Sequence, residues 1–205
     1  MKCLAVNTAN SVLSVALCDG EEAIYYFETI ETRDQGGLLL GHVEKSLAAA
    51  GMGYSGIDLM AVATGPGSFT GIRIGIAAMR ALALAAEKPL IGISSFDLFS
   101  VKSKNALNIV ALESWREELY FRTEGQAPVN QSPAAFAGTC TAEFGEVVIS
   151  GDASHKLAAF LPEATLWPRR ADARDLAAQA AAVYKAEGTA TAKRPVPFYL
   201  RPADV

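Results

Sequence analysis

One stretch, residues 59–76, constrains the fold of this chain more than any other. A short apolar run leads into a turn of glycine and proline, and a second apolar run leaves that turn. The first run stops at Gly65, which is typical of a buried strand. The second run continues to Ala86 and is rich in alanine and leucine, so it predicts a helix that Ser68 or Thr70 can cap. This strand–turn–helix order indicates an α/β fold, and in many proteins such a turn holds a phosphate.

The elements around this unit extend the α/β pattern over the first half of the chain. Three short strands separated by tight turns predict an antiparallel meander. The helix after them carries an apolar stripe at 3.6-residue spacing, formed by Leu38, Leu39, Val43 and Leu47. The predicted elements are strands Lys2–Thr8, Ser11–Asp19 and Glu22–Thr32, helix Gly37–Ala50, strand Ile57–Thr64, helix Thr70–Ala86, strand Leu90–Ile93 and helix Ser94–Val101.

The second half repeats the same plan in an abbreviated form. The polar segment Lys102–Asn105 predicts a joint between two domains, at residues 1–102 and 103–205. Residues 125–145 are rich in glycine, proline, alanine and threonine and predict loops with short extended pieces. The other predicted elements are strands Ala106–Glu113, Glu118–Thr123 and Glu146–Ser150, helices Ala153–Leu161 and Ala173–Glu187, and an extended end at Ala190–Val205. A weak structural duplication is therefore expected.

Composition excludes several classes of protein. Among the 205 residues, 51% are hydrophobic and 20% are charged, which predicts a well-buried core. The net charge of −4 lacks the basic surplus of an autonomous nucleic-acid binder. Three scattered cysteines and two histidines argue against a disulfide framework, a zinc cluster or a histidine metal site. No apolar segment reaches the length of a membrane span and no signal peptide is recognised, so we expect a cytoplasmic protein.

Nucleotide-binding motifs do not match the central turn. A Walker loop requires lysine and then serine or threonine after its last glycine, but Ile72 and Arg73 follow Gly71. A Rossmann fingerprint has a shorter glycine spacing and a ribose-binding acid after the next strand, which is absent here. The better interpretation is a rigid turn followed by a helix on which Gly71 and Gly75 let another backbone approach closely. Such a helix is either buried nearly all round or packed against another subunit.

Nucleophilic and acid–base sites are also weakly indicated. Ser68 lies outside a G-x-S-x-G motif and only two histidines exist, although sequence distance alone leaves a Ser/His/Asp arrangement open. The acidic cluster at 113–118 is more typical of a solvated hairpin than of paired catalytic carboxylates. In actin-like ATPases and sugar kinases an acid at the end of the first strand helps to hold Mg²⁺, whereas this chain has Asn7, a poorer ligand. These residues predict that fold without its catalysis.

The central motif resembles the signature of the bacterial tRNA threonylcarbamoyladenosine biosynthesis family TsaB, also called YeaZ. The resemblance rests on Thr64-Gly65-Pro66-Gly67-Ser68-Phe69-Thr70-Gly71-Ile72-Arg73-Ile74-Gly75. It extends to Leu4-Ala5-Val6-Asn7-Thr8, Gly92-Ile93-Ser94-Ser95, Glu118-Leu119-Tyr120 and Phe198-Tyr199-Leu200-Arg201. It implies an actin/Hsp70-like (ASKHA, ribonuclease H-like) two-lobed α/β fold with mixed sheets and an abbreviated second lobe.

The resemblance also implies a function. Such a protein is a non-catalytic accessory subunit that binds and supports its catalytic paralogue TsaD. With the small ATPase TsaE, that pair transfers a threonylcarbamoyl group to N6 of adenosine 37 in tRNAs that read ANN codons. The resemblance further implies a homodimer when the subunit is alone, contact with tRNA only through the complex, no membrane association, and no catalytic, cofactor or metal residues.

The contact with TsaD is implied to lie on the two helices of the first lobe. The residues carried over to this interface are Leu38, Leu39, His42, Val43, Ser68, Phe69, Thr70, Gly71, Ile72, Arg73, Gly75, Ile76, Ala78 and Met79. This agrees with the two-helix apolar surface expected from the residue pattern.

The chain departs from the family pattern at one residue and at two three-residue segments. Family members commonly have aspartate where this chain has Asn7, His-Ser-Glu in place of Gln35-Gly36-Gly37, and Asp-Ala-Arg in place of Glu113-Ser114-Trp115. The first helix keeps only His42 of the histidines that bind metal in the catalytic paralogues. Two alternatives remain: an autonomous ATPase or peptidase of the wider superfamily, and a homodimeric scaffold without a role in tRNA modification.

Overall fold

The structure is a computed structural model, and it describes residues 1–10, 12–30, 34–101, 106–140, 146–167, 171–188 and 194–201. The chain divides into two compact units. Unit 1 comprises Met1–Leu98 and Ala171–Phe198, and unit 2 comprises Phe99–Arg170 and Tyr199–Val205. The predicted joint Lys102–Asn105 lies outside the described residues.

Unit 1 is built on a five-stranded mixed sheet with the order β3-β2-β1-β4-β5. Strands β1, β2 and β3 form the expected antiparallel meander, while β4 and β5 run parallel to β1. The buried strands are nearly continuous in apolar residues, as expected for a sheet covered on both faces. The strand bounds are Lys2–Asn7 (β1), Leu13–Asp19 (β2), Glu22–Thr29 (β3), Leu59–Ala63 (β4) and Leu90–Ile93 (β5).

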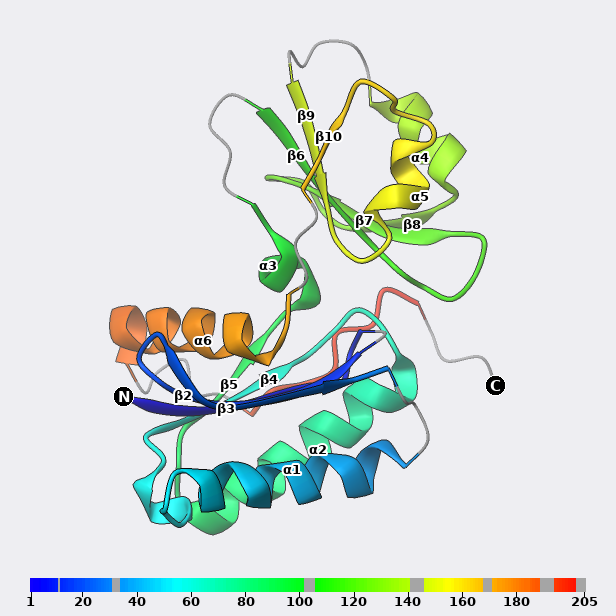
Figure 1. Cartoon of the computed structure of the whole chain (residues 1–205). Helices are drawn as coiled ribbons and strands as arrows, with labels where there is room; N and C mark the ends of the chain where they lie inside the picture. Colours follow the sequence, from blue (N-terminus) through cyan, green and yellow to red (C-terminus); the bar gives the residue numbers. More distant parts are fainter. Residues whose placement is uncertain are drawn as a thin grey trace. The chain divides into compact units, whose positions relative to one another are not determined.

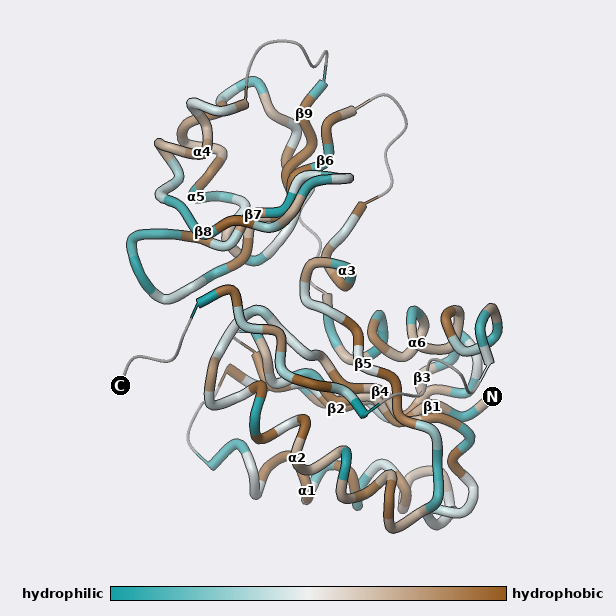
Figure 2. The backbone as a smooth tube through the Cα atoms, turned by 180° about the vertical axis from the view of Figure 1, so that it is seen from behind, coloured by the Kyte–Doolittle hydropathy of each residue, from teal (hydrophilic) through white to brown (hydrophobic). Residues whose placement is uncertain are grey.

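Three helices cover the two faces of this sheet. Helices α1 (Gln35–Ala49) and α2 (Phe69–Ala86) lie together on one face, and α6 (Ala173–Glu187) lies on the other (Figure 1). A 3₁₀ turn at Tyr54–Gly56 precedes β4, and the short helix α3 (Ser95–Phe99) follows β5. The hydropathy colouring shows brown along β4 and β5 and alternating brown and teal along α6, which is the pattern of a half-buried helix (Figure 2).

Unit 2 repeats the sheet of unit 1. Its strand order is β10-β9-β6-β7-β8, in which β7 and β8 extend an antiparallel hairpin from β6 while β9 and β10 run parallel to β6. Read from the hairpin edge, this is the same order and direction as in unit 1, so the expected duplication is confirmed. The bounds are Ala106–Leu112 (β6), Leu119–Thr123 (β7), Val129–Gln131 (β8), Glu146–Ser150 (β9) and Thr165–Leu166 (β10).

The core of unit 2 is small and centred on two aromatic rings. Phe121 on β7 stacks on Phe136 of α4, with 4.0 Å between the ring centroids. The helices α4 (Pro133–Thr139) and α5 (Ser154–Ala158) supply the covering layer. We expected loops at residues 125–145, but α4 forms because Ser132 caps it and Pro133 occupies its first turn. The Ser-Pro pair was the signal for this helix in the sequence.

The division of the chain differs from the predicted boundary at residue 102. Helix α6 follows the last strand of unit 2 in the sequence, yet it packs on the sheet of unit 1. The segment after it also returns to unit 1, where the Phe198 amide donates to the Thr64 carbonyl at 2.8 Å. Each unit therefore contains chain from more than one part of the sequence.

Helix α2 meets the length and composition of a membrane span, which the sequence analysis did not expect. It is 18 residues long and contains two charged residues, Arg73 and Arg80. By length and composition alone this is weak evidence, because the core helix of a folded domain passes the same test. Here Ile72, Ile76 and Met79 are buried inside unit 1.

Candidate partner-binding surface

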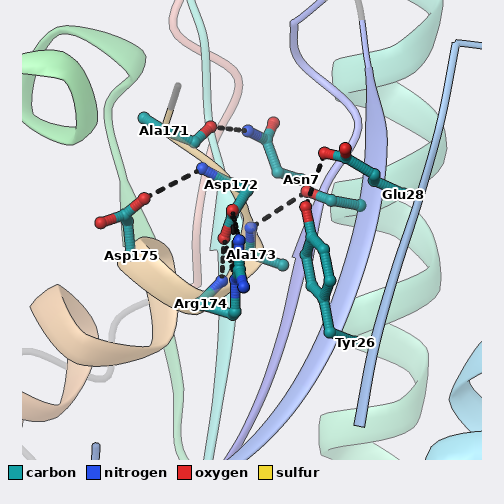
Figure 3. Close-up of polar contacts among 9 residues, drawn as sticks. Asn7, Tyr26, Glu28, Ala171, Asp172, Ala173, Arg174 and Asp175 are labelled. Carbon is teal, nitrogen blue, oxygen red and sulfur yellow. Dashed lines mark hydrogen bonds and ion pairs between the residues drawn. The ribbon is translucent and has the colours of Figure 1, made fainter. Parts of the chain in front are cut away.

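The turn between β1 and β2 is closed by its own hydrogen bonds. The side-chain oxygen of Asn7 accepts from the Ala9 amide at 3.0 Å, and its Nδ2 donates to Asn10 Oδ1 at 2.9 Å. The same Nδ2 also donates to the Ala171 carbonyl at 3.4 Å (Figure 3). Asn7 is only 1% exposed. Every polar group of this side chain is thus used inside the unit, as expected for a buried amide.

The β1–β2 turn also packs against the N-terminal end of α2. The Ser68 amide donates to the Ala9 carbonyl at 2.7 Å, and the Ser68 hydroxyl accepts from the Gly71 amide at 3.2 Å. Ser68 is therefore the N-cap that the sequence offered as one of two choices. Because a carbonyl oxygen already sits at the start of this helix, an anion would meet a negative partial charge there. The turn does not form the phosphate cradle that strand–turn–helix units often supply.

The glycines of the central motif make this close approach possible. A Cβ on Gly67 would overlap the carbonyl of Ala9, and a Cβ on Gly71 would overlap the carbonyl of Thr8. A Cβ on Gly75 would collide with the Thr8 hydroxyl, which donates to the Gly71 carbonyl at 2.7 Å. We expected Gly71 and Gly75 to let another backbone approach closely. In the structure both glycines face Thr8 in the β1–β2 turn of the same unit, with its carbonyl at Gly71 and its hydroxyl at Gly75.

The fourteen predicted interface residues divide by burial. Seven are buried in unit 1 and do not lie on its surface: Leu39, Val43, Gly71, Ile72, Gly75, Ile76 and Met79. Leu38, His42, Ser68, Phe69 and Ala78 are half-buried, whereas Thr70 and Arg73 are exposed. The apolar stripe of α1 faces the core because a helix that covers a sheet turns its most apolar side inward. Only the seven half-buried or exposed residues of the predicted interface are therefore accessible to a partner.

The sequence analysis named only the first two residues, Thr70 and Arg73, of an exposed stripe along α2. Thr70, Arg73, Ala77, Ala81 and Leu84 are exposed and recur at intervals of three or four residues, so they share one side of the helix. Leu84 is 75% exposed. Small side chains over most of this length would let a second helix approach closely. The spacing of these residues was visible in the sequence. The neighbouring buried stripe is more apolar, so most of the predicted interface residues were taken from that stripe.

On α1 the exposed apolar residue is Leu40, which is 45% exposed. We use the name outer helix face for six exposed residues of these two helices, namely Leu40 on α1 and Thr70, Arg73, Ala77, Ala81 and Leu84 on α2. The Arg73 guanidinium lies over the Phe69 ring, with its Cζ 3.8 Å from the ring centroid, which is a cation–π contact within α2.

His42 is held by aromatic neighbours on β3. Its Nδ1 lies 2.5 Å from the Tyr25 hydroxyl, and its ring stacks on Phe27. Burial, helped by the charge of Lys45, lowers the pKa of His42 below the usual value, so the ring is neutral near pH 7. Among the described residues, no group of three metal-ligating side chains surrounds it or gathers elsewhere.

A charged cluster fixes the start of α6 over the sheet (Figure 3). Asp172 caps the helix, with its carboxylate accepting from the Arg174 amide at 2.7 Å and from the Arg174 guanidinium at 2.6 Å. The Arg174 guanidinium also lies 3.9 Å from the centroid of the Tyr26 ring. Burial would raise the pKa of Asp172, but the hydrogen bonds from Arg174 outweigh it and the pKa is lowered. Asp175 completes a capping box, a spacing that was present in the sequence.

Glu113 builds a turn in unit 2. Its carboxylate accepts from the Ser114 and Trp115 amides at 3.2 and 3.0 Å and pairs with Lys156 Nζ at 2.5 Å. These partners use the carboxylate as a structural acceptor. The expectation of a hairpin at the 113–118 cluster, in place of paired catalytic acids, agrees with this geometry.

Comparison with known proteins decides the family. The family model described as TsaD, tRNA N6-adenosine threonylcarbamoyltransferase, matches residues 33–194. The chain belongs to this family. A relative named tRNA threonylcarbamoyladenosine biosynthesis protein TsaB, from Escherichia coli (strain K12), is 40% identical over 95 residues, covering 46% of this chain and 41% of the relative. The TsaB, or YeaZ, assignment made from the sequence motif is confirmed.

The chain spans about half the length of the curated TsaB relatives it matches. Solved structures support the fold. A Pseudomonas aeruginosa protein described as similar to peptidase YeaZ superposes with a TM-score of 0.77 at 24% identity, covering 98% of this chain and 99% of that one. A ROK hexokinase from Thermus thermophilus gives a TM-score of 0.52 at 12% identity, covering 91% and 100% of the two chains. The two-lobed ASKHA fold is thus confirmed.

Proposed function

We propose that this chain is a non-catalytic subunit in the synthesis of N6-threonylcarbamoyladenosine in tRNA, and that it binds the catalytic subunit TsaD through the outer helix face. The relatives named for threonylcarbamoyladenosine biosynthesis support the pathway. The proposal includes a cytoplasmic location, the ATPase TsaE as a further partner, a homodimer in the absence of TsaD, and contact with tRNA only through the complex.

The closed β1–β2 turn is the observation that carries the non-catalytic assignment. A catalytic member of an ATP-using fold needs carboxylates for Mg²⁺ and free amides for phosphate. Here Asn7 supplies a buried, fully bonded amide, and the Ala9 carbonyl occupies the start of α2. The glycines that would let a nucleotide approach are instead in contact with the chain's own backbone.

The outer helix face supports the binding role. Along α2, Ala77 and Ala81 present little more than backbone, so a partner helix can pack close to the axis. Leu84 on α2 and Leu40 on α1 add exposed apolar area. Arg73 is the charged residue among the six that define this face.

A bulky substitution at the centre of this face tests the proposal. Replacing Ala77 with tryptophan should abolish co-elution with TsaD of the same organism in size-exclusion chromatography, because the indole holds the partner helix away. Ala77 is exposed, so the fold should be retained. The matched control is Ala182→Trp on α6, an exposed alanine on the opposite side of the sheet, which should bind normally. Normal binding by Ala77→Trp would place the interface elsewhere.

Two further measurements separate the alternatives. Titration calorimetry of the lone chain with ATP and Mg²⁺ should show no saturable heat, and clear binding would favour an autonomous ATPase. Depleting the protein in its own cell should remove N6-threonylcarbamoyladenosine from tRNA, measured by mass spectrometry of nucleosides. An unchanged level of the modified nucleoside would leave only a scaffold role.

A further inference from the structure

A cavity of about 490 Å³ opens in unit 1 at the C-terminal end of α2. Its lining combines apolar side chains with three cations. Leu84, Pro89 and Pro195 contribute apolar walls, and Arg80, Lys88 and Arg194 contribute the positive charges. A site of this volume, largely apolar with a few convergent polar groups, has the composition of a ligand-binding cavity.

The guanidinium groups of the two arginines in this cavity donate no hydrogen bond to the described residues. Lys88 Nζ donates to the Ser55 carbonyl at 2.8 Å, so the lysine is anchored to its own unit. Within the described part of the chain, Arg80 and Arg194 have neither a hydrogen bond nor an ion pair. The planar guanidinium group of arginine matches a carboxylate or a phosphate with two parallel hydrogen bonds. Two such groups beside one cavity in a chain of net charge −4 therefore favour an anionic ligand.

The charges and side chains around the cavity favour a carboxylate over a polyphosphate or a nucleotide. The cavity lies at the C-terminal end of α2, where the helix dipole is negative, and Glu87 is part of its lining. Both features disfavour a polyphosphate. None of the described residues that line the cavity carries an aromatic ring on which a nucleobase could stack. A single carboxylate with an apolar side chain beside it matches both the arginines and the apolar walls.

We propose that this cavity binds an acidic segment of a partner protein, with one carboxylate between Arg80 and Arg194 and a neighbouring apolar side chain against Leu84 and Pro89. Charge complementarity carries this choice of ligand, since neither arginine has an ionic partner among the residues that the structure describes. The inference goes beyond the proposed function and does not require it, because it rests on the cavity alone and can be tested without TsaD.

The test uses the whole ¹⁵N-labelled chain and a blocked peptide of alternating glutamate and leucine. The peptide should shift the backbone amides of Leu84, Glu87 and Leu90 in a heteronuclear NMR titration, since these residues line the cavity. The same peptide with glutamine in place of glutamate should not bind. Equal binding by the glutamine peptide would overturn the proposal, as would tighter binding of ATP or oligouridylate at the same amides.

Two variants assign the binding to the arginines. The double change Arg80→Ala and Arg194→Ala should raise the Kd of the acidic peptide at least about tenfold, because two charge-assisted contacts are lost. The control, Lys45→Ala with Lys185→Ala, removes two exposed charges elsewhere and should leave the Kd unchanged. Arg194 is exposed, so Arg194→Ala alone keeps the fold and should raise the Kd at least about threefold.

An unchanged Kd in both arginine variants refutes the proposal. Its failure is distinguishable from that of the proposed function, because TsaD co-elution and the Ala77→Trp variant are measured independently of the peptide. A chain that binds the peptide but not TsaD removes only the proposed function.

Discussion

The same chemical change at two glycines should have opposite effects on stability. Gly41 lies inside α1, and a Cβ added there meets no atom within 4 Å. Gly71 lies in the first turn of α2, and a Cβ added there would overlap the Thr8 carbonyl and lie 3.1 Å from the Ser68 hydroxyl. Both glycines are helical, so helix propensity alone favours alanine at each. Only the tertiary contact distinguishes them.

The magnitudes follow from that contact. Gly41→Ala should raise the free energy of unfolding by about 1 kcal/mol, which is the helix-propensity difference between glycine and alanine. For a chain of this size that corresponds to a Tm increase of about 2–4 °C. At Gly71 the overlapped atom belongs to the backbone, so the overpacking cost is near the upper end of its usual range, about 3 kcal/mol. The propensity gain of about 1 kcal/mol leaves a net loss of about 2 kcal/mol, or a Tm decrease of about 4–8 °C.

Thermal unfolding followed by far-ultraviolet circular dichroism measures both variants. Hydrogen exchange of the β1 and β4 amides locates the effect in unit 1, where the Thr8–Gly71 contact lies. A Gly71→Ala protein that is as stable as the parent would refute the reasoning. That result would mean the β1–β2 turn moves away from α2 at no cost, and the glycine would then remain available to a partner.

Two other predictions concern titratable side chains. Asp172→Asn keeps a good N-cap but loses the ion pair with the half-exposed Arg174, so it should cost no more than about 1 kcal/mol at pH 7. Because the folded-state pKa of Asp172 is lowered, this contribution exists above the unfolded pKa and disappears as the pH falls through the folded pKa, which parallel acid-unfolding curves would show. Burial raises the pKa of all three thiols, so access to the reagent should decide their order of reaction. In a thiol-labelling time course the partly exposed Cys140 should react before the buried Cys3 and Cys18, and equal rates in the native protein would contradict this burial.

The extents of the strongly patterned elements were predictable from the sequence. The strand Leu90–Ile93 and the strand Glu146–Ser150 occur as predicted, and the predicted helix Thr70–Ala86 differs from α2 by one residue at its start. Local signals suffice in these cases, because a cap, a run of apolar residues and a glycine or proline each act within a few positions of the chain. Helix α4 was missed since the surrounding composition of glycine, proline and threonine outweighed its Ser-Pro start.

Features that depend on distant residues were not predictable. Nothing local to α6 indicates which of the two sheets it covers. That choice is made by long-range contacts, such as the Ala173 amide donating to the Ser14 hydroxyl at 3.0 Å. The burial of seven of the fourteen predicted interface residues inside unit 1 was likewise not predictable, because apolar spacing identifies the side of a helix that is buried but not what buries it.

The central stretch shows the division between sequence and tertiary structure most clearly. The residues of 59–76 by themselves determined a strand, a turn and a helix capped by Ser68, since backbone preferences and the apolar period are properties of the local chain. Only the tertiary structure decided which atoms pack against the glycines. A missing Cβ creates space, and the sequence does not say which atoms enter it. Here Thr8 and Ala9 enter that space, because β1 lies parallel to β4 and carries its turn over the start of α2.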